Sequence, residues 1–114
     1  MGLAPAPWKT PGMIVVQGVF VVAEGDRERF VEESLETQRI SRAEAGCLEY
    51  VVAPDPLDSG RVVLSERWAT RGDLDAHVEA LTARRAAAAE AGAAPVAPIS
   101  REVNFFEAES IDVM

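Results

Sequence analysis

The stretch MIVVQGVFVV, residues 13–22, decides the fold of this chain. Successive side chains on a β-strand point to opposite faces of the sheet. Ile14, Val16 and Phe20 point one way, whereas Val15 and Val19 point the other. Both sets are apolar, so the sequence predicts a strand that is covered on both faces. Helices can cover one face, and a second copy of the chain is the simplest cover for the other.

The rest of the chain alternates between helical and strand-like patterns. A helix is expected from Asp26, a favourable N-cap, to about residue 46, where Gly46 can end it. A second helix is expected from Thr70, whose spacing to Asp73 fits a capping box. The alanine-rich residues 83–94 either continue this helix or form a separate one. Further strands are expected at residues 47–53, 61–68 and 100–111.

This order, β-α-β-β-α-β, predicts an α+β domain with a ferredoxin-like antiparallel sheet. Residues 13–114 are expected to form this single domain. Residues 1–12 contain three prolines and Trp8, and we expect them to form a flexible tail. Because two helical regions cover only one sheet face, an apolar second face indicates a homodimer through the sheet.

Composition narrows the classes of function. The 114 residues carry a formal net charge of −8, which argues against nucleic acid or an anionic membrane as the main partner. No apolar run approaches the roughly 18 residues needed to span a bilayer, so we expect a cytoplasmic protein. Cys47 is the only cysteine, which favours a small buried residue over a disulfide or a reactive thiol.

Three short segments carry a resemblance to a known family. They are Ala43-Glu44-Ala45-Gly46-Cys47-Leu48-Glu49-Tyr50, Ser65-Glu66-Arg67-Trp68 and Leu74-Asp75-Ala76-His77. In this order and spacing, over about residues 13–111, the chain resembles the antibiotic biosynthesis monooxygenase family of the dimeric α+β barrel superfamily. The resemblance implies a cavity between the helices and the sheet. Some members oxygenate quinols or aromatic polyketide intermediates with O2 and without a metal or flavin cofactor.

His77 is the first candidate for catalysis. It shares an apolar helical stripe with Leu74, Val78 and Leu81, and an imidazole there can bind a substrate oxygen or move a proton. The alternative is a core histidine that hydrogen-bonds a backbone carbonyl. A single histidine without matching ligands argues against a protein metal site.

Trp68 and Glu66 share one face of the strand at 61–68. Trp68 can stack on an aromatic substrate and donate one hydrogen bond, or it can be a core anchor. Glu66 can act as a base if it is desolvated, or it can pair with an arginine such as Arg67 of another strand or subunit.

Several polar or aromatic residues complete the expected site. Gln17 interrupts the apolar first strand and resembles, only approximately, a family position that usually holds a substrate-contacting Asn. We therefore group it with His77 and Trp68 as catalytic. The expected substrate-binding residues are Tyr50, Glu66, Asn104 and Phe30. Tyr50 and Asn104 have structural alternatives as a core tyrosine and an inter-strand amide.

The sequence also departs from the family pattern. Many members carry a second histidine about five residues after the position of His77, where this chain has Thr82. Haem-degrading relatives need an axial histidine further along, where this chain has Arg84, Arg85 and alanines, so that activity is disfavoured. No dinucleotide fingerprint or phosphate loop is visible in the sequence.

Three hypotheses follow. The first is a cofactor-independent monooxygenase that acts on a quinol or aromatic polyketide-like substrate with O2. The second is an isomerase or lyase on the same scaffold, with His77 as the acid–base group. The third is a non-catalytic protein that binds a small molecule, because a fold does not fix a function.

Overall fold

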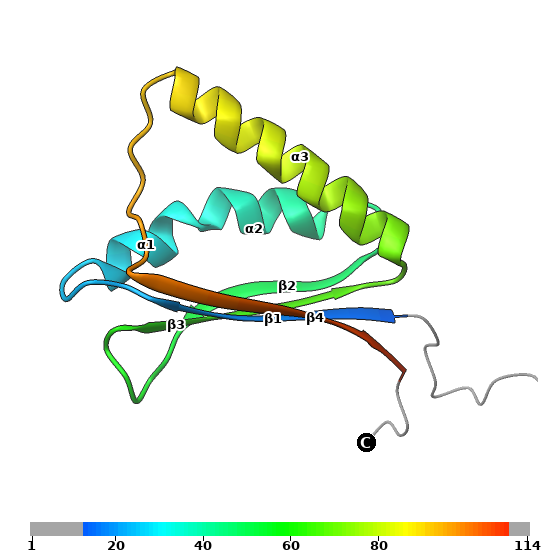
Figure 1. Cartoon of the computed structure of the whole chain (residues 1–114), viewed down its shortest axis with the longest axis horizontal. Coiled ribbons are helices and arrows are strands. Elements are labelled where there is room, and N and C mark those ends of the chain that lie inside the picture. Colours follow the sequence, from blue (N-terminus) through cyan, green and yellow to red (C-terminus); the bar gives the residue numbers. More distant parts are fainter. Residues whose placement is uncertain (1–12, 110–114) are drawn as a thin grey trace, which may run out of the picture.

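The computed structural model describes residues 13–109. Four strands form one antiparallel sheet in the order β2-β3-β1-β4, and the helices lie on one face of it (Figure 1). In chain order the elements are β1 Met13–Val21, α1 Arg27–Glu33, α2 Leu35–Arg42, β2 Cys47–Pro54, β3 Arg61–Trp68, α3 Arg71–Glu90 and β4 Ser100–Ala108. The predicted ferredoxin-like α+β fold is confirmed, and the sheet is not closed within one chain.

The first helical region differs from the single helix expected between residues 26 and 46. It is divided at Ser34 into α1 and α2, and α2 ends at Arg42. The hydroxyl of Ser34 donates to the carbonyl oxygen of Val31 at 2.6 Å. A serine that bonds its own backbone in this way competes with the helical hydrogen-bond ladder. Asp26 occupies the N-cap as expected, although its side chain makes no capping hydrogen bond.

The second helical region is one continuous helix, α3. Thr70 is its N-cap, and the Thr70 hydroxyl oxygen accepts from the backbone N–H of Asp73 at 3.1 Å. The expected cap is therefore present. The alanine-rich residues continue the helix as far as Glu90 rather than forming a separate one, which agrees with the high helix propensity of alanine.

The apolar core lies between the sheet and the helices. Residues directly opposite each other on paired strands share a face, so the register of β1 and β3 places Ile14 beside Trp68 and Val16 beside Glu66. The buried apolar residues of this core are Ile14, Val16, Val22, Tyr50, Val52, Val62, Leu64, Trp68 and Leu74. The alternate residues of the same strands face away from the helices.

The outer edge of β2 is capped by side chains of α2. Arg42 Nε donates to the carbonyl oxygen of Tyr50 at 2.8 Å, and Gln38 Nε2 donates to that of Val52 at 3.3 Å. Such capping blocks the edge against pairing with another strand. It also fixes α2 beside β2, which positions the turn between them for the site described below.

Two sequence-based expectations reach beyond the described residues. The expected tail at residues 1–12, with Trp8, lies outside the described residues. The last strand was expected to reach residue 111; β4 ends at Ala108, and residues 110 and 111 lie outside the described residues. Within residues 13–109, none of the helices combines the length and the apolar character that crossing a membrane requires.

Candidate functional site

His77 lies at the centre of a buried polar cluster under α3. Its side chain is only 2 % exposed, and its Nδ1 lies 2.6 Å from Oε1 of Glu44. A carboxylate oxygen accepts hydrogen bonds, so Nδ1 carries the hydrogen and Nε2 is left as the basic nitrogen. Nε2 faces Oε1 of Glu66 at 3.8 Å. The imidazole is thus held in one tautomer between two carboxyl groups.

Two aromatic rings enclose this imidazole. The Trp68 ring is tilted by 32° against it, with a centroid separation of 4.6 Å. The Tyr50 ring is tilted against it at 5.4 Å. Trp68 Nε1 donates to Oε1 of Glu66 at 2.9 Å, so indole, carboxyl group and imidazole form one network. Glu66 pairs with Trp68 and His77, not with the arginine that the sequence suggested as its alternative partner.

Burial changes the proton affinity of the groups around His77. Burial is the main cause that raises the pKa of Glu66 above its ordinary value. The hydrogen bond from Trp68 and the electrostatic interaction with His77 both act to lower this pKa. Burial, followed by the charge of Glu66, raises the pKa of Tyr50 to about 12. At 3.8 Å, Glu66 Oε1 is beyond hydrogen-bonding distance of His77 Nε2, so the two groups interact through charge and not through a direct hydrogen bond.

The turn before β2 brings Glu44 to His77. Gly46 has a φ of 75°, and a Cβ at this position would collide with the carboxyl group of Asp73. The carbonyl oxygen of Gly46 accepts from the backbone N–H of Ala69 at 2.8 Å, which ties this turn to the start of α3. Glu44 was quoted in the sequence as part of a motif but was not predicted as a site residue. Its position two residues before Gly46 was the only feature of the sequence that pointed to Glu44 as a site residue, because residues in turns follow no periodic pattern.

The structure brings some of the predicted site residues together and separates others. His77, Trp68, Glu66 and Tyr50 form the cluster. Gln17 and Asn104 are opposite each other on β1 and β4, on the sheet face that points away from the helices. Phe30 on α1 packs against Phe20, with ring centroids 5.3 Å apart, and makes no ring contact with His77.

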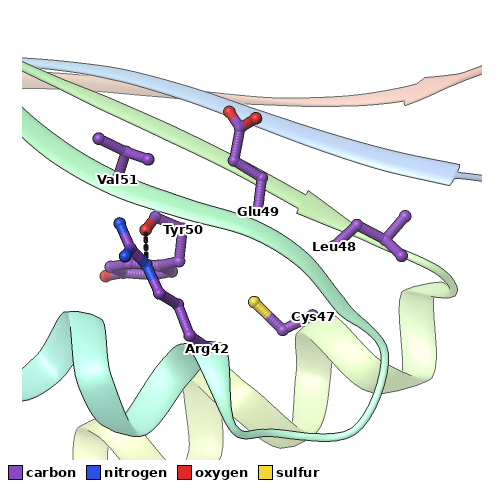
Figure 2. Close-up of a pocket in the computed structure, with 6 residues that line it drawn as sticks. All are labelled: Arg42, Cys47, Leu48, Glu49, Tyr50 and Val51. Carbon is purple, nitrogen blue, oxygen red and sulfur yellow. Dashed lines mark hydrogen bonds between the residues drawn. The ribbon is translucent and has the colours of Figure 1, made fainter.

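Two surface hollows lie beside this cluster, and neither is lined by His77, Glu66 or Trp68. The first, of about 370 Å³, lies along the edge of β2. Figure 2 shows its six lining residues, with the Arg42 side chain above Tyr50 and the Cys47 thiol near the turn. Burial, followed by the charges of Glu66 and Glu44, raises the pKa of Cys47, which makes the thiol less reactive.

The second hollow, of about 360 Å³, lies between α3 and β4. Its apolar lining comes from Leu74, Val78 and Phe105, and Phe105 is 57 % exposed. Its polar lining residues are Arg71, Asp75 and Glu79. His77 lies on the same two turns of α3 as Leu74 and Val78, but it does not line this hollow.

The single tyrosine of the chain makes its environment directly measurable. We expect ultraviolet absorbance to show Tyr50 ionising near pH 12 in the folded protein and near its ordinary value of 10.0 in urea. The stabilisation from the neutral buried phenol is complete below pH 10 and is lost as the pH rises toward 12. A folded-state transition near pH 10 would show that Tyr50 is not buried against Glu66.

The fold and this cluster define a class: a ferredoxin-like α+β domain with a histidine–carboxylate pair under its second helical region. A family model, antibiotic biosynthesis monooxygenase, matches residues 13–89. The chain belongs to this family. No curated protein matches the chain by sequence.

Solved structures share the fold. A candidate antibiotic biosynthesis monooxygenase from Deinococcus radiodurans superposes with a TM-score of 0.70 at 20% identity, over 89% of this chain and 98% of its own. A second, from Nitrosomonas europaea, has a TM-score of 0.68 at 24% identity, over 86% and 91%. A conserved protein from Methanosarcina mazei Go1 has a TM-score of 0.68 at 18% identity, over 86% and 94%.

Proposed function

We propose that the protein is a cofactor-independent monooxygenase that acts with O2 on a quinol or an aromatic polyketide-like substrate. The observation that carries this proposal is the pairing of the buried His77 with the half-buried Glu44, beside Trp68 and Glu66. Glu44 orients the imidazole through Nδ1, so Nε2 acts as a general base toward a phenolic or enolic hydroxyl group.

The proposed reaction draws its electrons from the substrate. Once Nε2 has accepted the hydroxyl proton, the electron-rich anion reacts with O2 at a ring carbon that carries hydrogen. One oxygen atom becomes bonded to that carbon, and two substrate hydrogens leave with the other oxygen atom as water. The imidazole returns its proton in the process. Trp68 and Tyr50 keep bulk water from the anion, which makes it a stronger electron donor.

Access to the imidazole is the step that this proposal requires. His77 is almost completely buried, so Nε2 can meet a substrate only if side chains of α3 move apart. The hollow between α3 and β4 offers an apolar surface for an aromatic ring. The burial of His77 also favours a second candidate function, in which this hollow binds a small molecule and the cluster only stabilises the fold.

Oxygen consumption separates these functions. We expect the protein to consume O2 when it is supplied with anthrone or 1,4-naphthohydroquinone, and to place one atom from ¹⁸O2 in the product. Heat-unfolded protein controls for autoxidation of the substrate. Saturable binding without O2 uptake would support the non-catalytic function instead. Turnover without O2 uptake would support an isomerase or lyase.

We also propose that two copies pack through the sheet face that points away from the helices. Figure 1 shows all helices on the opposite face. The alternation of β1 and β3 places several valines on the uncovered face, and Phe106 on β4, 49 % exposed, joins them. The apolar residues on this face include Val15, Val19, Val21, Val51, Val63 and Phe106, with the polar residues Gln17, Ser65 and Asn104 among them. An apolar surface of this kind marks an interaction site.

A further inference from the structure

The hollow between α3 and β4 exposes large apolar side chains. Phe105 is 57 % exposed and Val78 is 44 % exposed, and both line it. Phe105 is opposite the core residue Val16, so it lies on the helix-bearing face of the sheet. A second copy on the other face would leave it uncovered. The volume, about 360 Å³, is near the lower end of the range for ligand pockets and suits one aromatic group.

The polar lining of the hollow has an excess of negative charge. Arg71 Nε lies 3.1 Å from Oδ1 of Asp75, so these two charges are paired. Glu79 also lines the hollow and makes no hydrogen bond or ion pair within residues 13–109. An occupant that combines an aromatic ring with a neighbouring positive charge therefore matches both the apolar and the polar lining.

The chain enters the fold beside this hollow. β1 begins at Met13, which is opposite Ala108 at the end of β4. Figure 1 shows the start of β1, the start of α3 and the end of β4 at the same end of the sheet. Val16, the partner of Phe105, follows Met13 by three residues, which is about 10 Å along a strand. The segment that leads into β1 therefore joins the fold within a short distance of the hollow.

Residues 1–12 contain an occupant of the required chemistry. Trp8 is followed by Lys9, the only lysine of the chain, and the segment has no acidic residue. Four residues separate Trp8 from Met13, and an extended chain of this length spans up to about 17 Å. The three prolines of the segment restrict its conformations before docking, which lowers the entropic cost of ordering it.

We propose that residues 1–12 dock in this hollow of their own chain. The Trp8 ring lies against the exposed apolar lining, and Lys9 lies beside Glu79. The apolar contact supplies most of the stabilisation, because an ion pair at the surface contributes little. A small molecule that binds in the hollow must then displace Trp8. The inference does not rest on the proposed oxygenation, since it concerns only which group fills the hollow.

The segment after β4 is a poorer occupant, although it leaves the sheet at the same end. It carries Glu109 and Asp112 and has no basic residue. Asp75 and Glu79 would repel these charges. The difference in charge between the two segments therefore favours residues 1–12.

The environment of Trp8 can be measured by ¹⁹F NMR on the full chain labelled with 5-fluorotryptophan. The chain has two tryptophans, so Trp8→Phe assigns both signals. We expect the docked form to exceed the undocked form at least about tenfold, because burial of a large aromatic side chain is strongly favourable. The Trp8 signal should then shift little between H2O and D2O. The signal of the buried Trp68 reports whether each variant is folded.

Phe105→Lys should release Trp8, because it removes apolar lining and repels Lys9. The Trp8 signal should then show the full solvent shift of an exposed indole. Phe106→Lys is the matched control: it makes the same change at the next residue, which is 49 % exposed and on the opposite face. A solvent-exposed Trp8 in the parent protein would overturn the inference, and so would equal release by both substitutions.

Zero-length cross-linking with a carbodiimide tests the position of Lys9. We expect a peptide map to show Lys9 joined to Glu79, with loss of this product in Glu79→Gln and its retention in Glu28→Gln, which changes an exposed residue of α1. A mixture of ¹⁵N-labelled and unlabelled protein should give no cross-linked peptides of mixed label. A cross-link only between copies would overturn docking within one chain, and a link of Lys9 to other carboxylates alone would overturn the site.

Discussion

Replacing His77 with alanine is expected to lower kcat for O2-dependent turnover by about 10²- to 10⁴-fold, the usual contribution of a positioned general base. Glu44→Gln should lower kcat by a smaller factor, because the imidazole keeps a hydrogen-bonding neighbour at Nδ1 but loses the carboxylate that orients it most strongly. Glu28→Gln is the matched control, since it removes a carboxylate from the exposed surface of α1. Initial rates of O2 uptake measure all three variants.

A structural role of His77 must be separated from a catalytic one, because its ring fills space between Trp68 and Tyr50. Removal of a buried ring leaves a cavity and lowers the free energy of unfolding. Two readouts depend only on proton transfer. Added imidazole should restore part of the rate of His77→Ala, and hydroquinones with more acidic hydroxyl groups should lose less rate. Equal losses for all substrates, without rescue, would contradict the role as a base.

The sequence predicted the sheet well because strand alternation is a local property. The strand expected at 61–68 coincides with β3, and the faces expected for β1 agree with its burial pattern. The break at Ser34 was missed, because the apolar stripe of the first helical region continues through it and a serine is compatible with a helix. In the structure the Ser34 hydroxyl donates to the carbonyl oxygen of Val31, which competes with the helical hydrogen bonds at this point.

The candidate site was predicted only in part. Trp68, which was predicted as catalytic with His77, and Glu66, which was predicted as a substrate-binding residue, both lie beside His77, because each is on a face that alternation or helical spacing defines. Gln17 was grouped with them on resemblance, yet its odd position in β1 places it with Val15 and Val19, away from His77. Alternation alone could have separated it from the cluster. Glu44 reaches His77 through a turn, and the path of a turn depends on contacts between distant segments that periodicity does not encode.

The uncovered sheet face leads to the second large effect, on self-association. Val19→Lys is expected to weaken the proposed dimer at least a hundredfold, which corresponds to about 3 kcal/mol, because the substitution places an ammonium group in an apolar interface. Val19 is opposite Glu102 on β4, so the new lysine can pair with this carboxylate in the separated chain. The monomer fold should therefore tolerate the change better than the interface does.

Sedimentation equilibrium over a wide range of protein concentration measures the dissociation constant. Leu57→Lys is the matched control, since Leu57 lies in the loop between β2 and β3 and is 95 % exposed. It should leave the dissociation constant unchanged. A monomeric parent protein at every concentration would refute the dimer itself. A Val19→Lys dimer of unchanged affinity would show that the interface lies elsewhere, because burying a charged side chain against the partner's valines carries a desolvation cost that lowers affinity.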